Sequence, residues 1–449
     1  MKSSLKLLIA FCLCPSVAFT EGLYGSVPID EDELRELIES SYELEGYFAG
    51  QSIIFSDEEL LGIVRDVGHS LTPPPTDLYI NYEFFILRDA SPQAFALPNG
   101  HIYISTGMLA RLEDESQLAA VLSHEINHVA GHHGIVNDRS VAKKRVALTV
   151  LSGISTVMPT GTDIYGDFYC PDCAFVAIVA DAVSVSLAAS VFGFSRELEQ
   201  EADNFAAVLM LDSPYDPHAL PEIFEILRQD YEGLNPRVPT TWSTHPELEL
   251  RAEIAHALVD DLPRRERESD AYQIATLPLR AMTIRDYVQD DYPHTALALA
   301  ESLAERYPDD ARMRLLLADA WQSMGANSRI DPEEWSNRDK RHNLRQRAKR
   351  TREQRMAELL EDEEGRAAYQ ANMSMAEKTY REVLAMDPSM AQAHRGLGEV
   401  YENLDRPRDA ADEYLTYARA EPDAPDRTVI IGRLRGLTEQ IREQQEDEE

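Results

Sequence analysis

One short run, VLSHEINHVAGHHG at residues 121–134, constrains this sequence more than any other because it places five ionisable side chains among small and aliphatic residues. His124 and His128 are four residues apart, so on a helix of about 3.6 residues per turn both imidazoles leave one face. Glu125 lies about 100° round the axis from His124. Unpaired imidazoles and carboxylates are costly on a buried helix. The run therefore predicts a zinc site, with Glu125 placed to take a proton from an attacking water. The alternative is a set of core histidines that pair within the protein.

A zinc site of this type needs a third protein ligand. The metzincin pattern would place a histidine at position 134, which is Gly134. A second stretch, SRELEQEAD at residues 195–203, offers three carboxylates instead: Glu197, Glu199 and Glu201. Metal-bound histidines usually donate their other N–H to a carboxylate, so the ligand and a second acidic residue should share a helix face. Glu199 and Asp203 are four residues apart and share one, whereas Glu201 lies about 200° from each. We therefore expect Glu199 to be the ligand and Asp203 to orient a histidine.

The N-terminal sequence MKSSLKLLIAFCLCPSVAFTEG has the pattern of a secretory signal peptide, with two lysines, a short apolar run and a small-residue cleavage site near Ala18. We expect residues 1–18 to be removed and the chain to be exported. The formal net charge of −36 argues against binding to nucleic acid or to anionic lipid.

Between these motifs the sequence predicts an α+β fold. Residues 30–70 have helical patterns, and strands are expected at 78–87, 94–97 and 101–105, around the turn signal Pro98-Asn99-Gly100. Asp114-x-x-Gln117 resembles a capping box that starts the helix of the opening motif. We expect a mainly helical domain over residues 19–268 with a small antiparallel sheet.

A helical repeat follows. Pro388 and Pro422 are 34 residues apart, and each follows a helix with the same alanine and tyrosine pattern, Ala376 with Tyr380 and Ala410 with Tyr414. This is the tetratricopeptide period. We expect an all-α repeat domain over residues 269–437, a charged insertion at about 327–370 and a disordered acidic tail at 438–449. Such repeats usually hold peptides or partner proteins, and a rigid cover for the first domain is the alternative.

Two features stay open. Residues 338–355 hold nine basic residues against two acidic ones, which suits a solvated helix or an acidic partner. Cys170 and Cys173 suit a local disulfide in an exported chain, since no second CxxC is present to complete a zinc ribbon.

Three motifs in this order, HEINH at 124–128, SRELEQEAD at 195–203 and STHP at 243–246 with Arg251, resemble the HtpX and CAAX-prenyl-protease clan of gluzincin zinc peptidases. The resemblance covers roughly residues 30–265, and the soluble, exported, repeat-bearing branch of the clan fits best. It implies one Zn²⁺ per chain held by His124, His128 and Glu199, with Glu125 as general base.

The resemblance also places His245 close to the metal. This residue would either stabilise the developing oxyanion or occupy the fourth zinc position and silence the enzyme. Residues 94–105 resemble the strand pair that borders the cleft in this clan, whose edge would pair with an extended substrate; a plain hairpin is the alternative. Membrane members of the clan have transmembrane helices, but we expect the apolar stretch 174–194 to be a buried helix.

The resemblance implies a periplasmic zinc endopeptidase that cleaves unfolded or misassembled envelope proteins. Its repeats would recruit substrate or an outer-membrane protein assembly complex, with no nucleic acid partner and at most peripheral contact with the membrane. The competing hypothesis is a repeat chaperone or adaptor for outer-membrane protein assembly with a latent protease site. An intact base at Glu125 favours hydrolysis, because a pure adaptor has no need of one.

Overall fold

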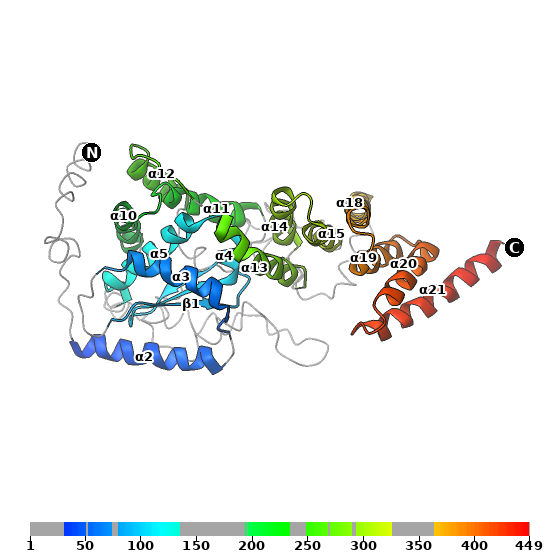
Figure 1. Cartoon of the computed structure of the whole chain (residues 1–449), viewed down its shortest axis with the longest axis horizontal. Coiled ribbons are helices and arrows are strands. Elements are labelled where there is room, and N and C mark those ends of the chain that lie inside the picture. Colours follow the sequence, from blue (N-terminus) through cyan, green and yellow to red (C-terminus); the bar gives the residue numbers. More distant parts are fainter. Residues whose placement is uncertain are drawn as a thin grey trace. The chain divides into compact units, whose positions relative to one another are not determined.

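The computed structural model describes residues 31–50, 53–73, 80–134, 194, 196–233, 248–267, 270–289, 293–325 and 363–448. It has two compact units (Figure 1): the first reaches Thr276, and the second begins at Leu277 and also includes residues 229–238. The boundary therefore falls inside helix α13 (Asp270–Gln289). The predicted signal peptide, Cys170 with Cys173, the apolar stretch before Phe194 and the basic stretch 338–355 lie outside the described residues and stay predictions.

The fold class is confirmed, and the first unit contains one small sheet. Its strands are β1 (Glu83–Leu87), β2 (Ala94–Ala96) and β3 (His101–Ser105). The order is β1-β3-β2, with β2 antiparallel and β1 parallel to β3. The sheet is therefore mixed, which corrects the expected antiparallel sheet. Strand alternation shows which side chains are buried but not which strands are neighbours, and here β3 inserts between the two earlier strands.

The turn between β2 and β3 lies where Pro98-Asn99-Gly100 predicted it. Gly100 has a φ of 95°, and a Cβ at this position would lie 2.6 Å from the carbonyl oxygen of Asn81. Only glycine meets both conditions without strain. The turn holds β2 at the edge of the sheet, next to the helix that carries the HEINH motif.

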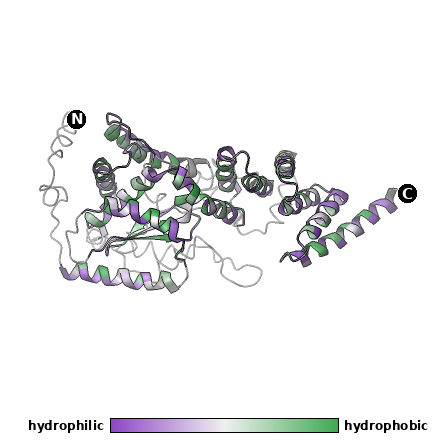
Figure 2. Ribbon diagram, viewed as in Figure 1, coloured by the Kyte–Doolittle hydropathy of each residue, from purple (hydrophilic) through white to green (hydrophobic). Residues whose placement is uncertain are grey.

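Helices cover both faces of this sheet. Helix α2 (Glu31–Gly50) lies on one face in Figure 1 and has mixed hydrophobic and hydrophilic residues along its length in Figure 2. Its apolar residues join the strands in a buried cluster of Leu44, Phe48, Leu87, Phe95, Leu97 and Tyr103. Helices α3 (Glu58–Leu71) and α5 (Glu115–Ala130) pack against the strands from the other face.

Helix α5 is the centre of the first unit. After the short helix α4 (Thr106–Arg111), its predicted cap is confirmed, since the Asp114 side chain accepts from the Gln117 amide at 2.9 Å. Every residue from Ser116 to Ala130 is buried. Helix α10 (Arg196–Asp212) packs along α5, and α12 (Leu248–Val259) packs on α10. Helix α11 (Ala219–Gly233) follows α10 in the chain.

The second unit is a series of helices: α14 (Pro293–Arg306), α15 (Ala311–Gly325), α18 (Glu363–Met386), α19 (Ala391–Asn403), α20 (Pro407–Ala420) and α21 (Arg427–Glu448). The tyrosines that defined the 34-residue period, Tyr380 and Tyr414, are fully buried. Their rings lie against Gly396 and Gly398 of α19, where an added Cβ would come within 2.2 Å and 2.6 Å of them. The repeated tyrosine and glycine positions are therefore the sites at which neighbouring helices approach closely.

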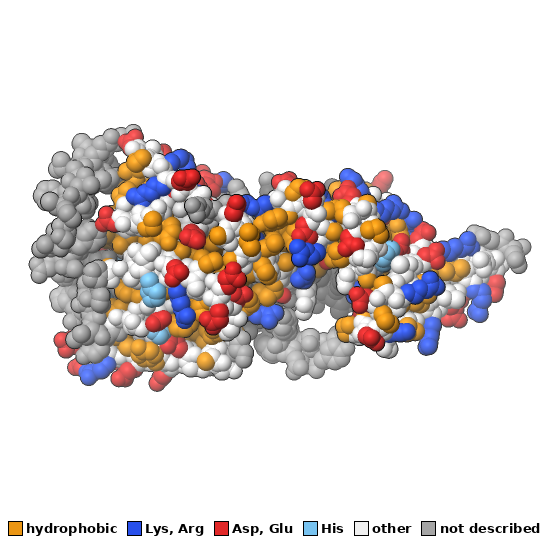
Figure 3. Space-filling model, in the orientation of Figure 1, with side chains coloured by type: hydrophobic (Ala, Val, Ile, Leu, Met, Phe, Trp, Pro, Cys, Tyr) orange, Lys and Arg blue, Asp and Glu red, His pale blue; other side chains and the backbone are white. Residues whose placement is uncertain are grey.

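The C-terminal segment corrects a prediction. Residues 438–449 were expected to be disordered, but α21 continues to Glu448. Glu, Gln and Arg are good helix formers, and Arg442 lies 3.6 Å from Glu439 and 3.7 Å from Glu446 on adjacent turns. Acidic and basic side chains are intermixed over this unit on the face drawn in Figure 3. Among the described helices, none combines the length and the hydropathy needed to cross a membrane.

Candidate metal centre

Three ligand-type side chains from two helices meet in the first unit. His124, His128 and Glu199 are 1%, 4% and 2% exposed, and each offers a ligand atom within 4.8 Å of the others. The two histidine Nε2 atoms are 3.0 Å apart. Glu199 Oε2 lies 3.4 Å from His124 Nε2, and Glu199 Oε1 lies 3.7 Å from His128 Nε2. Ligand atoms around a tetrahedral zinc ion are about 3.3 Å apart, so the three residues fit such an ion.

The outer ring nitrogens of both histidines already face partners. His124 Nδ1 lies 2.9 Å from Asp203 Oδ1, and His128 Nδ1 lies 2.9 Å from His133 Nδ1. When each Nδ1 carries the proton and donates outward, both Nε2 lone pairs face inward beside the Glu199 carboxylate. Two lone pairs and a carboxylate directed at one point are a donor set that could hold a metal cation.

The charges around His124 favour a cation. Burial alone would disfavour a charged ring, but hydrogen bonds and charges from Asp203 and Glu199 outweigh it and raise the pKa of His124 to about 9. Glu125, next to His124 in the sequence, is also buried, at 5% exposed. Burial, only partly offset by the charge of His124, raises the pKa of Glu125 to about 7. The site is therefore electrostatically prepared for positive charge.

Asp203 is held by an arginine. Arg251 donates from Nε and Nη2 to the two carboxylate oxygens of Asp203, both at 2.7 Å. Burial opposes ionisation, yet Arg251 and His124 keep the pKa of Asp203 below its usual range. Arg251 is 7% exposed and lies over the Phe224 ring at 4.7 Å. The sequence had marked Arg251 only as part of the third motif and had given it no role.

The other side of the site is formed by His133 and Phe194. His133 is 1% exposed, and its ring contacts the candidate ligand His128 as described above. The Phe194 ring stacks on His128 with centroids 4.1 Å apart. Both residues hold the His128 ring in one orientation. In the sequence analysis, neither residue was assigned a role beside His128. The one available sign was the position of His133, five residues after His128.

The three acidic candidates on α10 separate as the helix geometry requires. The Glu199 side chain is 3% exposed, whereas that of Glu201 is 36% exposed and lies 4.0 Å from His133 Nε2. Glu197 is exposed. Of the described glutamates on this helix, Glu199 is the one that reaches both histidines. His245 lies outside the described residues, so its two possible roles stay predictions.

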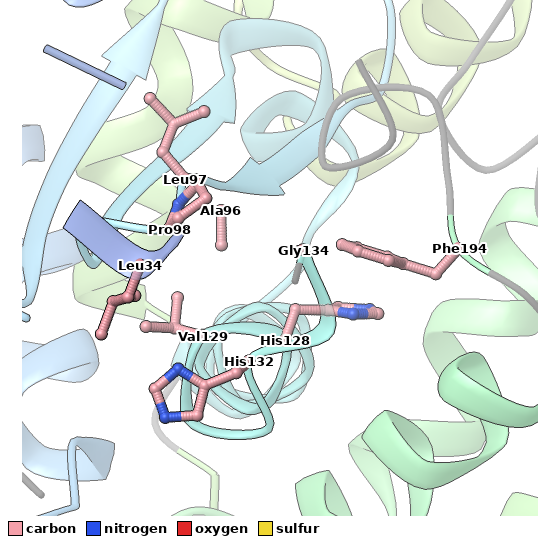
Figure 4. A pocket seen from close by; sticks show the side chains of 9 residues that line it. All are labelled: Leu34, Ala96, Leu97, Pro98, His128, Val129, His132, Gly134 and Phe194. Atoms are coloured by element: carbon pink, nitrogen blue, oxygen red, sulfur yellow. The ribbon is translucent and has the colours of Figure 1, made fainter. Parts of the chain in front are cut away.

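A pocket opens beside the site (Figure 4). In this view along α5, His128 and Phe194 point toward each other on one side, while Leu34 and Val129 lie on the other. Ala96 and Leu97, at the end of edge strand β2, complete the wall together with Pro98, His132 and Gly134. An apolar pocket therefore lies between the edge of the sheet and the candidate metal-ligand histidine His128.

Comparisons with known proteins agree with this geometry. Residues 57–259 match the model of peptidase family M48, and residues 364–425 match a tetratricopeptide repeat. The beta-barrel assembly-enhancing protease of Escherichia coli K12 is 24% identical over 202 residues, 45% of this chain and 39% of the relative. The protein of that name in Yersinia pestis is 22% identical over 277 residues, 62% of this chain and 53% of the relative.

The mitochondrial metalloendopeptidase OMA1 of Schizosaccharomyces pombe is 27% identical over 229 residues, 47% of this chain and 61% of the relative. Each of these matches spans less than two thirds of the relative's length. The matched region contains both helices of the candidate metal site and Arg251. Residues 57–259 are therefore a metallopeptidase domain of family M48, and a tetratricopeptide repeat follows it in the chain.

Proposed function

We propose that this chain is a zinc-dependent endopeptidase that hydrolyses peptide bonds in unfolded or misassembled proteins of the cell envelope. The observation that carries the proposal is the buried set of His124, His128 and Glu199, whose inward-facing donors fit one zinc ion, with Glu125 on the same helix. A zinc ion held there would supply Lewis-acid chemistry, polarising a carbonyl and making water more acidic.

The protein residues have separate tasks in this proposal. Glu125 takes a proton from the attacking water and delivers it to the leaving amine, since it ligates nothing. Asp203, itself held by Arg251, fixes the ring of His124, and His133 does the same for His128. The rigid surroundings keep the ligand atoms in place so that little reorganisation accompanies the reaction.

The pocket beside His128 supports a peptide substrate. Its lining includes Leu34, Leu97 and Phe194, so an apolar group of a bound peptide would find apolar contacts next to His128. The repeats, the predicted signal peptide and the names of the bacterial relatives support envelope substrates and recruitment of an outer-membrane assembly complex.

The test is cleavage of an unstructured protein such as casein by wild type and by Glu125→Gln at equal zinc content. We expect the variant to keep one zinc ion per chain and to lose hydrolysis, because the amide cannot take up the proton. Metal analysis and an electrophoretic assay measure both. A variant as active as wild type would refute the mechanism. A wild type that binds zinc and promotes assembly of outer-membrane proteins without cleaving any would favour the adaptor.

His245 needs a separate variant. If its imidazole occupies the fourth zinc position at rest, His245→Ala should raise casein cleavage, and this is the outcome we expect. If it instead stabilises the oxyanion, turnover should fall by about a hundredfold or more with zinc retained. Unchanged cleavage would rule out both roles.

A further inference from the structure

The short segment Pro263-Arg264-Arg265-Glu266-Arg267 connects α12 to α13, and it contacts the two metal-bearing helices at the ends away from the metal. At the metal end, His128 near the C-terminus of α5 faces Glu199 in the first turn of α10. At the opposite end, the amide of Asp216, just after α10, donates to Ser116 Oγ at the start of α5. The helices are therefore antiparallel, and residues 263–267 lie against the second end.

Arg265 binds the C-terminal end of α10. Its guanidinium donates to the main-chain oxygens of Met210 at 3.0 Å, Leu211 at 2.7 Å and Tyr215 at 2.7 Å, and also to that of Ser213. The last carbonyls of a helix have no partners within it and carry partial negative charge. One guanidinium therefore satisfies several of these acceptors and fixes where α10 ends.

Arg267 binds carboxylates from three places at the start of α5. It lies 3.4 Å from Asp114, the N-cap residue of α5, and donates to Asp216 at 3.1 Å and to Glu222 of α11 at 2.7 Å. Glu222 in turn accepts from Gln117 in the first turn of α5 at 3.0 Å. The Arg267 side chain is 19% exposed, so water screens these charges only partly. Without this cation, three carboxylates would face one another.

The same end of α5 holds the start of α13. Gln273 donates to the Glu113 side chain at 2.8 Å, and the Tyr272 hydroxyl donates to the carbonyl of Leu109 at 3.2 Å. The start of α13 is therefore attached to the residues that immediately precede α5 and its N-cap Asp114.

Helix geometry turns a small rotation here into a large effect at the metal. Asp114 is ten residues from His124 and Asp212 is thirteen from Glu199, which is about 15 Å and about 20 Å along the helices. If the angle between the axes of α5 and α10 changes by about 3°, with the ends near Arg265 and Arg267 held fixed, Glu199 moves by about 1 Å relative to the histidines. Zinc sites tolerate only about 0.2 Å in ligand distances.

We propose that Arg265 and Arg267 are positioning residues of the metal centre, which set the packing of α5 against α10. The inference rests on the proposed zinc peptidase function and adds to it the side chains, remote from the metal, that hold the two ligand-bearing helices against each other.

The test compares zinc affinity in the full-length protein by competition with a fluorescent chelator, for wild type, Arg265→Met, Arg267→Met and Arg267→Lys. Arg264→Met is the matched control, because Arg264 is in the same segment and is exposed. We expect about tenfold weaker zinc binding for each Met variant, less for Arg267→Lys, which keeps the charge, and no change for the control. At saturating zinc, kcat should fall while KM for casein stays within about twofold.

The readouts separate positioning from plain stabilisation. A lower unfolding temperature with unchanged zinc affinity in the folded protein would overturn the inference and leave the proposed function intact. A wild type that binds no zinc would overturn both. If the Met variants fail to fold, Glu222→Gln removes one carboxylate partner of Arg267 and should weaken zinc binding in the same direction by a smaller factor. An unchanged zinc affinity in Glu222→Gln would likewise contradict the positioning role of Arg267.

Discussion

The two units pair their ionisable groups in different ways. In the first unit, His124, His128 and Glu199 bring ligand atoms together at one point, where a metal cation could bind. In the repeat unit, carboxylates are paired with hydroxyl protons: Tyr380 lies 2.6 Å from Asp319, Tyr414 lies 2.8 Å from Glu402, and Tyr417 lies 2.8 Å from Asp426. These repeat pairs need nothing from outside the chain. The first unit should therefore depend on metal for its stability and the second should not.

Removing metal tests this contrast most strongly. Zinc at about a thousand times its dissociation constant stabilises a protein by about 4 kcal/mol, provided that it binds the folded state alone. Hydrogen exchange with and without a chelator should show protection lost in α5 and α10 and kept in α18 and α20. Equal loss in both units, or no loss in either, would contradict the contrast.

The next largest effect separates the acidic residues of α10. We expect Glu199→Gln to weaken zinc binding by more than about a hundredfold and Asp203→Asn by about ten- to a hundredfold, because the first is a ligand and the second orients one. Glu201→Gln is the matched control and should change little, since that side chain is partly exposed and lies outside the three-residue set. Chelator competition measures all three. A larger loss for Glu201→Gln than for Glu199→Gln would show that the helix-face argument is wrong.

The smallest effect concerns pH and the repeat unit. Burial raises the pKa of Asp319 to about 6, with the nearby Glu399 acting in the same direction and the hydrogen bond from Tyr380 opposing it. Tyr380 has a single hydroxyl proton but lies 2.6 Å from both Asp319 Oδ1 and Gln322 Oε1. Both contacts can be hydrogen bonds only when Asp319 itself is protonated. The geometry and the raised pKa of Asp319 therefore agree.

Because the folded state binds this proton more tightly than the unfolded chain, stability falls as the pH rises from about 4 to about 6 and then levels off. Asp319→Asn removes the titration. The melting temperature of wild type relative to this variant should therefore be higher at pH 4.5 than at pH 7.5, by about 2–4 °C. Asp309→Asn, at an exposed position two residues before α15, is the control. A difference that does not vary with pH would exclude Asp319 as the titrating group.

The sequence by itself determined the features that depend on local helix geometry. The spacing of His124 and His128 put two imidazoles on one face, and the same rule selected Glu199 and Asp203 over Glu201, as the side-chain exposures now show. The 34-residue period likewise marked Tyr380 and Tyr414 as equivalent positions, and both side chains are buried. Such inferences succeed because a helix fixes the direction of each side chain within a few residues. Composition was a weaker guide, since the acidic C-terminal segment is helical to Glu448.

Only the tertiary structure decided which distant residues meet. Arg251 reaches Asp203 across 48 residues, and Arg267 reaches Asp114 across 153. The parallel pairing of β1 with β3 likewise depends on the tertiary structure. No periodicity encodes these contacts, because they depend on how finished helices and strands pack and on which buried charges must then be neutralised. The sequence thus named the residues that can hold a metal, and packing brought together the residues that hold those ligands in place.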